Sequence, residues 1–208
     1  MHDSKPSPTQ LQPRIHHFSE LIAAPDIAER IRNFVNQGYR YFAPENTSRW
    51  EPCVDRLVDL PSFHKQLGDR GLIAIIYDPD NSSIPIACAA TSPWDGGFDG
   101  GYSPDELDGG WEIKIVTTKE GWMGKGLAGK CVDALFAEVV RLERVDLSRV
   151  DADRKLRFWI QTVECVNGAF WRRKGWKDVR GTDHEAGWFG SKEGYRLLVM
   201  TKKVDIDT

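Results

Sequence analysis

Hydrophobic and polar positions recur along this chain with two periods, and each period predicts one kind of element. Apolar residues repeat at helical spacing over residues 27–37 and 127–144, which predicts two amphipathic helices. Continuous or alternating apolar runs predict strands, and two shorter patterns predict short helices. The expected strands cover residues 14–22, 72–77, 84–91, 111–117, 156–163, 176–179 and 195–204, and the expected short helices cover residues 61–69 and 167–174.

The order of these elements indicates the fold class. The turn residues of segment 78–83 join two strands into a hairpin, so strands and helices do not simply alternate. This order predicts a mixed α/β domain and not a repeating βαβ wheel. Residues 1–13, rich in Pro, Ser and Gln, are expected to form a disordered tail, and residues 14–208 a single domain. The glycine-rich, acidic segment 93–110 is expected to be a long functional loop.

Composition and charge narrow the function classes. The 208 residues are 40% hydrophobic and 28% charged, which is typical of a globular domain. A net charge of -3 lacks the excess of Lys and Arg that a general nucleic-acid binder needs. The sequence contains no apolar run of about 18 residues and no secretory signal, so we expect no membrane contact and a cytoplasmic location.

The cysteines predict no metal site. Cys53, Cys88, Cys131 and Cys165 lie far apart and form no CxxC pair, whereas a structural zinc site needs closely spaced thiolates. Three of the four stand in apolar surroundings, which favours reduced thiols packed in a core.

The segment Gly124–Cys131, GKGLAGKC, fits three nucleotide-binding patterns. Read as a P-loop, it has Cys131 where a hydroxyl must hold magnesium. Read as a dinucleotide fingerprint, it has Glu143 at about the right distance, but this residue ends a helical pattern and not a strand. Read as the start of a long helix, it suits a pyrophosphate, because exposed amides and the helix dipole attract anions. A glycine-rich helix start that binds nothing is the fourth possibility.

The surroundings of this segment favour the third pattern. Residues 111–140, WEIKIVTTKEGWMGKGLAGKCVDALFAEVV, resemble the central motif of GNAT-superfamily N-acetyltransferases: a strand, a loop (here 123–128), and a long amphipathic helix. Residues 170–176, FWRRKGW, resemble the second motif of that family, usually Phe-Tyr-x-x-x-Gly-Phe. The resemblance covers residues 72–204 well and the first 70 residues weakly.

The resemblance implies a fold, a cofactor and a set of contacts. The fold is an α/β (α+β) mixed sheet, mostly antiparallel with a splayed parallel pair of strands and flanked by helices. The co-substrate is acetyl-CoA, and no metal is involved. The implied cofactor-binding residues are Val116, Thr117 and Thr118 through their backbone, Met123, Gly124, Lys125, Gly126, Leu127 and Ala128 in the loop, and Asn167 and Trp171 downstream.

Three of these positions raise questions. Met123 stands where the family usually has Gln or Arg. Trp171 replaces the usual Tyr, which protonates the leaving thiolate, and an indole has no accessible acid equilibrium. The general acid is therefore expected to be Tyr195, Tyr102 or water. Asn167 lies slightly downstream of the family's usual Asn and is equally suited to be a helix N-cap.

The catalytic base is expected to be Glu112, on the strand before the loop. An acceptor amine must lose a proton before it attacks, and a carboxylate, or a water that it holds, can take that proton. The alternative for Glu112 is an exposed side chain paired with Lys114 or with a neighbouring strand. His184 is a weaker candidate for proton transfer. Acidic residues of the loop either attract a cationic amine or are simply solvated; they are Asp95, Asp99, Asp105, Glu106 and Asp108.

These observations predict an acetyl-CoA-dependent N-acetyltransferase that acts on a primary amine, of a small molecule, by direct attack in a ternary complex. No covalent acyl-enzyme is expected, because Cys131 and Cys165 stand in contexts suited to packing. A protein or peptide acceptor is the first alternative, and a catalytically silent acyl-CoA-binding module is the second. We expect a monomer or homodimer that binds no nucleic acid.

Overall fold

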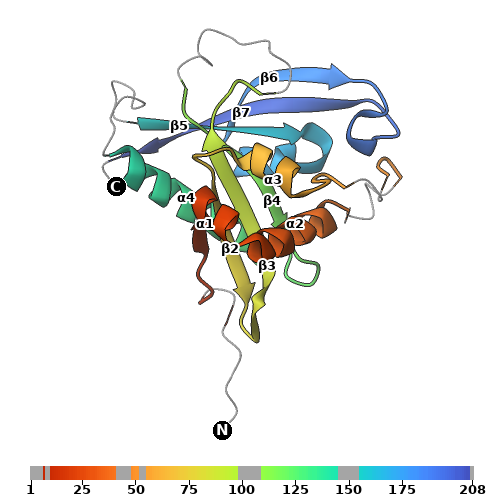
Figure 1. Cartoon of the computed structure of the whole chain (residues 1–208). Coiled ribbons are helices and arrows are strands. Elements are labelled where there is room, and N and C mark those ends of the chain that lie inside the picture. Colours follow the sequence, from red (N-terminus) through yellow and green to blue (C-terminus); the bar gives the residue numbers. More distant parts are fainter. Residues whose placement is uncertain are drawn as a thin grey trace. The chain divides into compact units, whose positions relative to one another are not determined.

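The computed structural model describes residues 7, 10–40, 48–51, 55–97, 109–144 and 155–206. Its strands form a seven-stranded sheet in the order β1-β2-β3-β4-β5-β7-β6 (Figure 1). The strands are β1 (Arg14–His17), β2 (Leu72–Asp78), β3 (Asn81–Pro93), β4 (Trp111–Thr118), β5 (Lys155–Val163), β6 (Lys177–His184) and β7 (Tyr195–Asp205). The helices are α1 (Phe18–Ala23), α2 (Pro25–Arg40), α3 (Leu60–Leu67), α4 (Leu127–Glu143) and α5 (Ala169–Arg173), with a π-helical turn η4 (Glu164–Gly168) and a 3-10 turn η5 (Trp188–Gly190).

The chain divides into two compact units. Unit 1 comprises residues 1–41, 55–91 and 115–137, and unit 2 comprises residues 42–54, 92–114 and 138–208. β4 and α4 each contribute residues to both units. The expectation that residues 14–208 fold as one domain stays a prediction.

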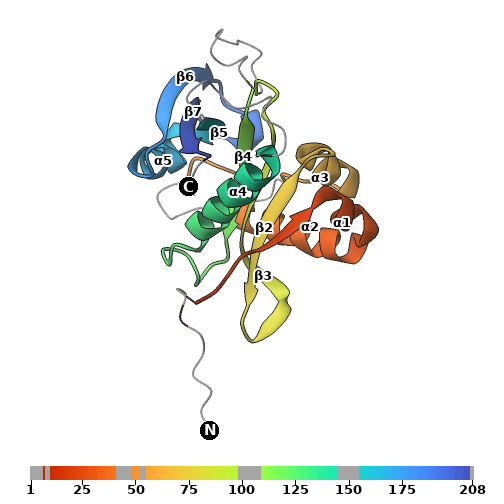
Figure 2. The same ribbon diagram turned by 90° about the vertical axis from the view of Figure 1, so that its left-hand side faces the viewer.

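Unit 1 is built on the antiparallel strands β1, β2 and β3. The first five residues of β2 are all buried, because helices cover both faces of this part of the sheet. In Figure 2, α1, α2 and α3 lie on one face of the β2–β3 pair and α4 lies on the other. The core contains Ile31 and Phe34 of α2, Phe63 of α3 and Ile73 of β2.

The sequence explains where the helices of unit 1 begin. α2 starts with Pro25, whose fixed φ suits a first helical position, and has Asp26 in its first turn. α3 starts with a capping box, in which the Ser62 amide donates to Asp59 Oδ1 at 2.8 Å and the Asp59 amide donates to Ser62 Oγ at 3.1 Å. These contacts lower the pKa of the Asp59 carboxyl. The Ser62 amide has the larger effect and the Ser62 hydroxyl the smaller one.

Unit 2 is built around β5 and β7, which pair antiparallel over nine residues from Lys155–Asp205 to Val163–Leu197. β6 pairs antiparallel with the other edge of β7. β4 and β5 run parallel through three residue pairs, and Glu112 lies opposite Trp159. The predicted mixed sheet, mostly antiparallel with one parallel pair, is confirmed.

Several element boundaries differ from those expected. The strand expected over residues 14–22 ends at His17, and α1 follows, which directs Leu21 into the core and packs Phe18 against it. β3 begins at Asn81, inside the expected turn, which shortens the hairpin connection to two residues. β6 reaches His184 although most of its residues are exposed, because its partner β7 supplies the backbone hydrogen bonds. The helix expected over residues 167–174 divides into η4 and α5.

Candidate functional site

The predicted site residues fall into two groups, one in each unit. The end of β4 and the following segment 119–126, called the glycine loop below, belong to unit 1. Glu112, Asn167, Trp171 and Tyr195 belong to unit 2. β4 carries both Glu112 and, further along the same strand, Val116 to Thr118.

The glycine loop owes its shape to three residues with left-handed backbone. Gly121, Gly124 and Gly126 have φ values of 81°, 75° and 79°, which side chains other than glycine rarely tolerate. A Cβ added at Gly124 or Gly126 would meet nothing within 4 Å. These glycines are therefore required by the backbone conformation and not by crowding, and the space in front of them is open to a ligand.

The loop leads directly into α4, whose first hydrogen bond runs from the Lys130 amide to the Gly126 carbonyl at 3.1 Å. The amides of the first turn, Leu127 and Ala128 among them, have no acceptor within the helix and point out of its start. α4 is 17 residues long, so its dipole places about half a positive charge at this end. Together these features fit the pyrophosphate of coenzyme A.

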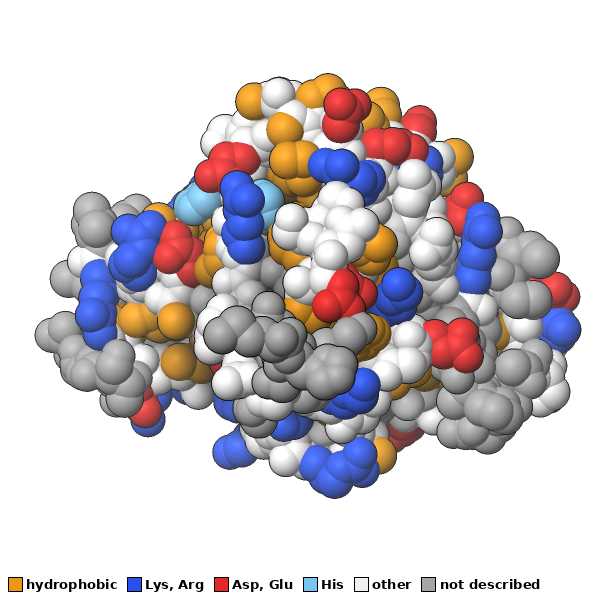
Figure 3. All heavy atoms as spheres, turned by 90° about the horizontal axis from the view of Figure 1, so that it is seen from below, with side chains coloured by type: hydrophobic (Ala, Val, Ile, Leu, Met, Phe, Trp, Pro, Cys, Tyr) orange, Lys and Arg blue, Asp and Glu red, His pale blue; other side chains and the backbone are white. Residues whose placement is uncertain are grey.

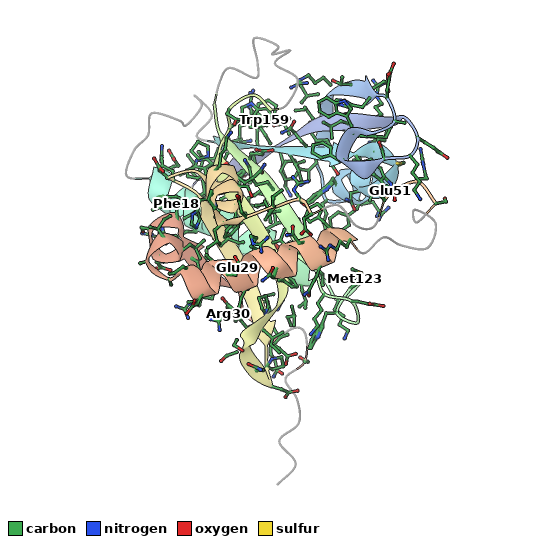
Figure 4. All side chains as sticks on the ribbon, turned by 45° about the vertical axis from the view of Figure 1, so that its right-hand side comes forward. Phe18, Glu29, Arg30, Glu51, Met123 and Trp159 are labelled. Atoms are coloured by element: carbon green, nitrogen blue, oxygen red, sulfur yellow. The ribbon has the colours of Figure 1, made fainter. Side chains whose placement is uncertain are left out.

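The side chains of the loop lie at its rim. Lys125 Nζ stands 4.5 Å from the centroid of the Trp122 ring, a cation–π contact that holds its charge beside the loop. Met123 is 40% exposed and lies in the loop before α4 (Figure 4). The structure gives no explanation for the identity of Met123, and the groups of the loop that suit an anion are its backbone amides and the Lys125 ammonium.

The three backbone amides predicted to bind the cofactor at the end of β4 do not all point in the same direction. The Thr117 amide faces the Cys88 sulfur and the Lys119 amide donates to the Ile86 carbonyl at 2.8 Å, so both point toward β3. Because backbone groups alternate along a strand, the amides of Val116 and Thr118 point to the opposite edge. Val116 and Thr118 are thus oriented to bind a ligand that adds to this edge, and the Thr117 amide is not.

A close helix contact fixes the Thr117 side chain. A Cβ added at Gly38 of α2 would lie 1.9 Å from Thr117 Oγ1, so the helix backbone passes directly over this residue. β4 also bends nearby, because Ile115 has a φ of 55° and its carbonyl accepts a hydrogen bond from Cys88 Sγ at 3.3 Å. Sequence reasoning missed Gly38, since a lone glycine late in a helix carries no motif.

The residues that suggested a P-loop have other roles. Lys130 Nζ donates to the Leu11 carbonyl at 3.0 Å, so this ammonium is directed to the N-terminal segment. Cys131 is fully buried, and burial raises the pKa of its thiol to about 12. Glu143, which suggested a dinucleotide site, is buried at the end of α4 and accepts a hydrogen bond from the Trp111 indole at 3.1 Å.

Glu112 in unit 2 is a buried carboxylate with two partners. It is 5% exposed, its Oε2 lies 2.7 Å from Lys114 Nζ, and its Oε1 accepts a hydrogen bond from Gln161 Nε2 at 2.9 Å. The expected pair with Lys114 exists, but it is buried and not exposed. Gln161 was not predicted, because only the β4–β5 register places it beside Glu112. We call these three residues the Glu112 cluster.

Aromatic and glycine contacts surround the Glu112 cluster. Trp94 stacks on Trp159 with ring centroids 5.1 Å apart, and the Trp159 indole donates to the Gly109 carbonyl at 2.8 Å. A Cβ at Gly97 would lie 2.6 Å from Gln161 Oε1. Both described ends of the 93–110 segment therefore contact β5. Asp99, Tyr102, Asp105, Glu106 and Asp108 lie outside the residues that the structure describes.

Tyr195 borders a pocket of about 350 Å³ in unit 2. Its ring stacks on His184, with centroids 5.3 Å apart, and also contacts Trp50 at 5.1 Å. Charged residues of both signs and one thiol complete the lining, namely Arg49, Glu164, Cys165, Asp183 and Arg196. Cys165 is exposed, so the expected packed thiol is wrong at this position; in η4 the buried residue is Gly168.

Asn167 and Trp171, the two residues predicted to bind the cofactor after β5, differ in exposure. Asn167 is exposed within η4, and no side chain caps α5, so the N-cap alternative is wrong. Trp171 is 6% exposed and packs against Trp176 and Phe170, with ring centroids 5.6 and 4.9 Å away. Their contacts with a cofactor stay predictions.

Figure 3 shows acidic and basic side chains interspersed over the face seen from below. Within the described ranges, no helix is long and apolar enough to cross a membrane. The same ranges hold no group of three or more His, Cys, Asp or Glu residues placed to bind a metal ion.

Solved structures resemble this chain along almost its whole length. NAA60 from Arabidopsis thaliana in complex with acetyl-CoA aligns with a TM-score of 0.55 at 13% identity, over 94% of this chain and 99% of that chain. An acetyltransferase of the GNAT family from Streptococcus pneumoniae aligns with a TM-score of 0.54 at 10% identity, over 94% and 99%. The ribosomal-protein-S18-alanine N-acetyltransferase from Escherichia coli aligns with a TM-score of 0.55 at 12% identity, over 93% and 95%.

No protein-family model and no curated protein sequence matches the chain. At these identities the structural likeness establishes the fold alone. The chain has the fold of the GNAT acetyltransferases, as the two sequence motifs predict.

Proposed function

We propose that this chain is an acetyl-CoA-dependent N-acetyltransferase whose acceptor is a primary amine. The observation that carries the proposal is the glycine loop, in which Gly124 and Gly126 adopt left-handed backbone, face open space and lead into the start of a 17-residue helix. Such a cradle of amides suits a pyrophosphate. The GNAT fold of the chain and the acetyl-CoA bound to one structural neighbour support the same ligand.

Each part of the cradle has a separate task. Acetyl-CoA supplies an activated acetyl group as a thioester. The amides of the first turn of α4 and Lys125 hold the phosphate groups, while the outward amides of Val116 and Thr118 hold the pantetheine arm. An amide placed at the carbonyl oxygen also stabilises the negative charge that develops there during attack.

Glu112 acts as the base that makes the acceptor amine nucleophilic. The ammonium gives a proton to the carboxylate, directly or through one water, and the new N–C bond then forms as the C–S bond breaks. Lys114 and Gln161 fix the orientation of the carboxylate, and each of its oxygens keeps a second lone pair for a proton. Tyr195 is the proposed donor of the proton that the departing thiolate takes up.

The acceptor is proposed to be a small amine. The pocket beside Tyr195 measures about 350 Å³, which is near the lower end, about 300 Å³, of small-molecule sites. Its two carboxylates are Glu164 and Asp183, each paired with an arginine, and an acceptor ammonium would compete with those arginines for them. A protein or peptide amine is the second candidate, because one structural neighbour is a ribosomal-protein-S18-alanine N-acetyltransferase.

Two measurements test the proposal in sequence. Isothermal titration is expected to show binding of acetyl-CoA, with ATP and NAD as negative controls; no heat with acetyl-CoA at millimolar concentration would remove the proposal. Thiol release is then measured with a panel of small amines and a panel of peptides. Turnover with small amines supports the proposed acceptor, and turnover with peptides alone supports the second candidate. Binding without any turnover indicates a silent acyl-CoA-binding module.

A further inference from the structure

A second and smaller pocket lies within unit 1, between α2 and the strands β1, β2 and β3. Its volume is about 80 Å³, and its polar lining comes from Arg14, His16, Arg30, Tyr77, Ser82 and Ser83. The acetyltransferase proposal assigns no role to any of these residues. Ile27, Ile31 and Pro85 form the apolar part of the wall.

The two arginines of this pocket differ from their neighbours in α2. Arg32 lies 2.5 Å from a carboxylate oxygen of Glu29, and Arg40 lies 2.6 Å from one of Asp55. Over the part of the chain that the structure describes, neither Arg14 nor Arg30 has a hydrogen bond or an ion pair. Two cations from different elements thus border one pocket without an anion between them.

Both guanidinium groups lie close enough to Tyr77 to affect its pKa. Burial raises the pKa of the Tyr77 phenol, while the positive charges of Arg14 and Arg30 act in the opposite direction. Figure 4 shows Arg30 on α2, on the side nearer the β2–β3 hairpin. The hydroxyl and the two cations are therefore within electrostatic reach of one another.

A buried histidine is hydrogen-bonded to the Tyr77 hydroxyl. His16 is 2% exposed, and its Nε2 lies 2.9 Å from the Tyr77 oxygen. Burial, together with the charge of Arg14, lowers the pKa of His16, so this imidazole is neutral near pH 7. The Glu20 carboxylate beside Nδ1 favours the proton of the neutral ring on that nitrogen, so Nε2 accepts a hydrogen bond from the Tyr77 hydroxyl. Glu20 lies 3.5 Å from Nδ1 and is the nearby counter-charge. Arg14, Arg30 and Glu20 together carry a net charge of one positive.

The size of the pocket limits the ligand. About 80 Å³ exceeds the share of two water molecules, at roughly 30 Å³ each. It is far below the roughly 300 Å³ at which sites for whole organic ligands begin. Arginine side chains bind planar pairs of oxygens on phosphates and carboxylates through paired N–H groups. A small oxyanion satisfies both the size and the charge.

We propose that this pocket is an oxyanion site, in which Arg14 and Arg30 hold a phosphate group and the hydroxyl of Ser82 donates a further hydrogen bond to it. The phosphate is either free inorganic phosphate or the terminal group of a phosphomonoester that projects out of the pocket. This site is independent of the acetyltransferase activity, because none of its residues belongs to the glycine loop or to the Glu112 cluster.

Titration calorimetry with inorganic phosphate at low ionic strength tests the site. Arg14→Gln and Arg30→Gln are each expected to weaken binding about tenfold, because each removes charge-assisted hydrogen bonds. The double variant is expected to show no binding. Arg40→Gln is the matched control, since it removes the same charge from the same helix but outside the pocket, and its affinity is expected to stay within about twofold. Equal weakening in Arg40→Gln, or wild-type binding in the double variant, would overturn the proposal.

A second measurement follows His16 directly. Phosphate is expected to shift the imidazole NMR signals of His16 and to raise its pKa, whereas chloride at the same ionic strength leaves both unchanged. The same shift with chloride, or none with 20-fold excess phosphate over the measured Kd, contradicts the assignment. Glycerol 3-phosphate separates the two sources: tighter binding than inorganic phosphate indicates a phosphomonoester ligand, and weaker binding indicates the free ion.

Discussion

The glycine loop and the Glu112 cluster obtain their chemistry in opposite ways. The loop is exposed and offers backbone amides, and its glycines have open space around them. The cluster is buried and offers side chains, each held by a contact with another side chain. A backbone site depends on a local run of residues, whereas a side-chain site depends on which strands pair and in which register.

This difference determines how each region responds to substitution. In the loop, the position of a glycine matters more than the identity of the side chains beside it. In the cluster, one carboxylate is the proposed base, and Lys114 and Gln161 act through it. We therefore expect the largest effects on turnover from the cluster and the largest effects on cofactor binding from the loop.

Glu112→Gln is expected to produce the largest change. The amide has the same size and can still accept a hydrogen bond from Lys114, but it has no basic site. A lost general base typically lowers kcat by about 10²- to 10⁴-fold. Steady-state kinetics with the best acceptor amine measure this loss, and calorimetry is expected to show acetyl-CoA affinity within about twofold of wild type.

A half-buried carboxylate outside the Glu112 cluster provides the control for Glu112→Gln. Glu138 pairs with Arg141 at 2.7 Å on α4, so Glu138→Gln also removes one acid of an ion pair. Its kcat is expected to stay near that of the wild type. If Glu112→Gln retains more than a third of the wild-type kcat in a folded protein, the base lies elsewhere and the cluster is structural.

Gly126→Glu is expected to have the next largest effect, on binding instead of turnover. The new side chain disfavours a φ of 79° and places a carboxylate where the phosphates are proposed to lie. Like charges brought together cost several kcal/mol, so acetyl-CoA affinity is expected to fall about a hundredfold. Isothermal titration measures the change.

Gly68 separates backbone strain from the effect on the ligand. It ends α3 in the same unit, has a φ of 66° and also faces open space, so Gly68→Glu places the same charge at another glycine with positive φ. This variant is expected to be destabilised but to bind acetyl-CoA normally. Equal losses of affinity in both variants would mean that the loop binds nothing specific.

The same difference explains how much the sequence could predict. The strands, the long helix α4 and the loop followed from local periodicity and from two motifs, and so did the GNAT fold. Gln161 could not be predicted, because it lies 49 residues from Glu112 and only strand register brings them together. Exposure of Cys165 was missed because apolar neighbours in sequence do not show which way a π-helical turn directs a side chain.

Gly38→Ala tests whether α2 positions the end of β4. Alanine in a helix gains about 1 kcal/mol over glycine, but overpacking typically costs about 1–3 kcal/mol. The new Cβ would lie 1.9 Å from Thr117 Oγ1, so we expect the cost to exceed the gain and a net destabilisation of about 1 kcal/mol. Urea unfolding measures it.

Two further variants sharpen this result. Thr117→Ala removes the overlapping oxygen, so the double variant is expected to recover at least half of the loss. Gly168 of η4 has its nearest neighbour 3.4 Å from an added Cβ, so Gly168→Ala is the uncrowded control. A Gly38→Ala protein as stable as the wild type would show that α2 shifts freely and does not fix Thr117.

Cys131→Ala is expected to have the smallest effect on turnover, because the Cys131 thiol, close to the glycine loop, takes no part in the proposed reaction. Burial raises the pKa of the Cys131 thiol to about 12, so near pH 8 only about one molecule in 10⁴ carries the thiolate. Deprotonation therefore requires a pH close to 12. In a Cys53→Ser background, iodoacetamide at pH 8 is expected to modify the exposed Cys165 and to leave Cys88 and Cys131 intact, as peptide mass spectrometry will show. The turnover of Cys131→Ala is expected to stay within about twofold of wild type. A folded but inactive Cys131→Ala protein would instead point to a covalent acyl-enzyme on Cys131. A thiol beside the glycine loop would then carry out a step that we assign to backbone amides and Glu112.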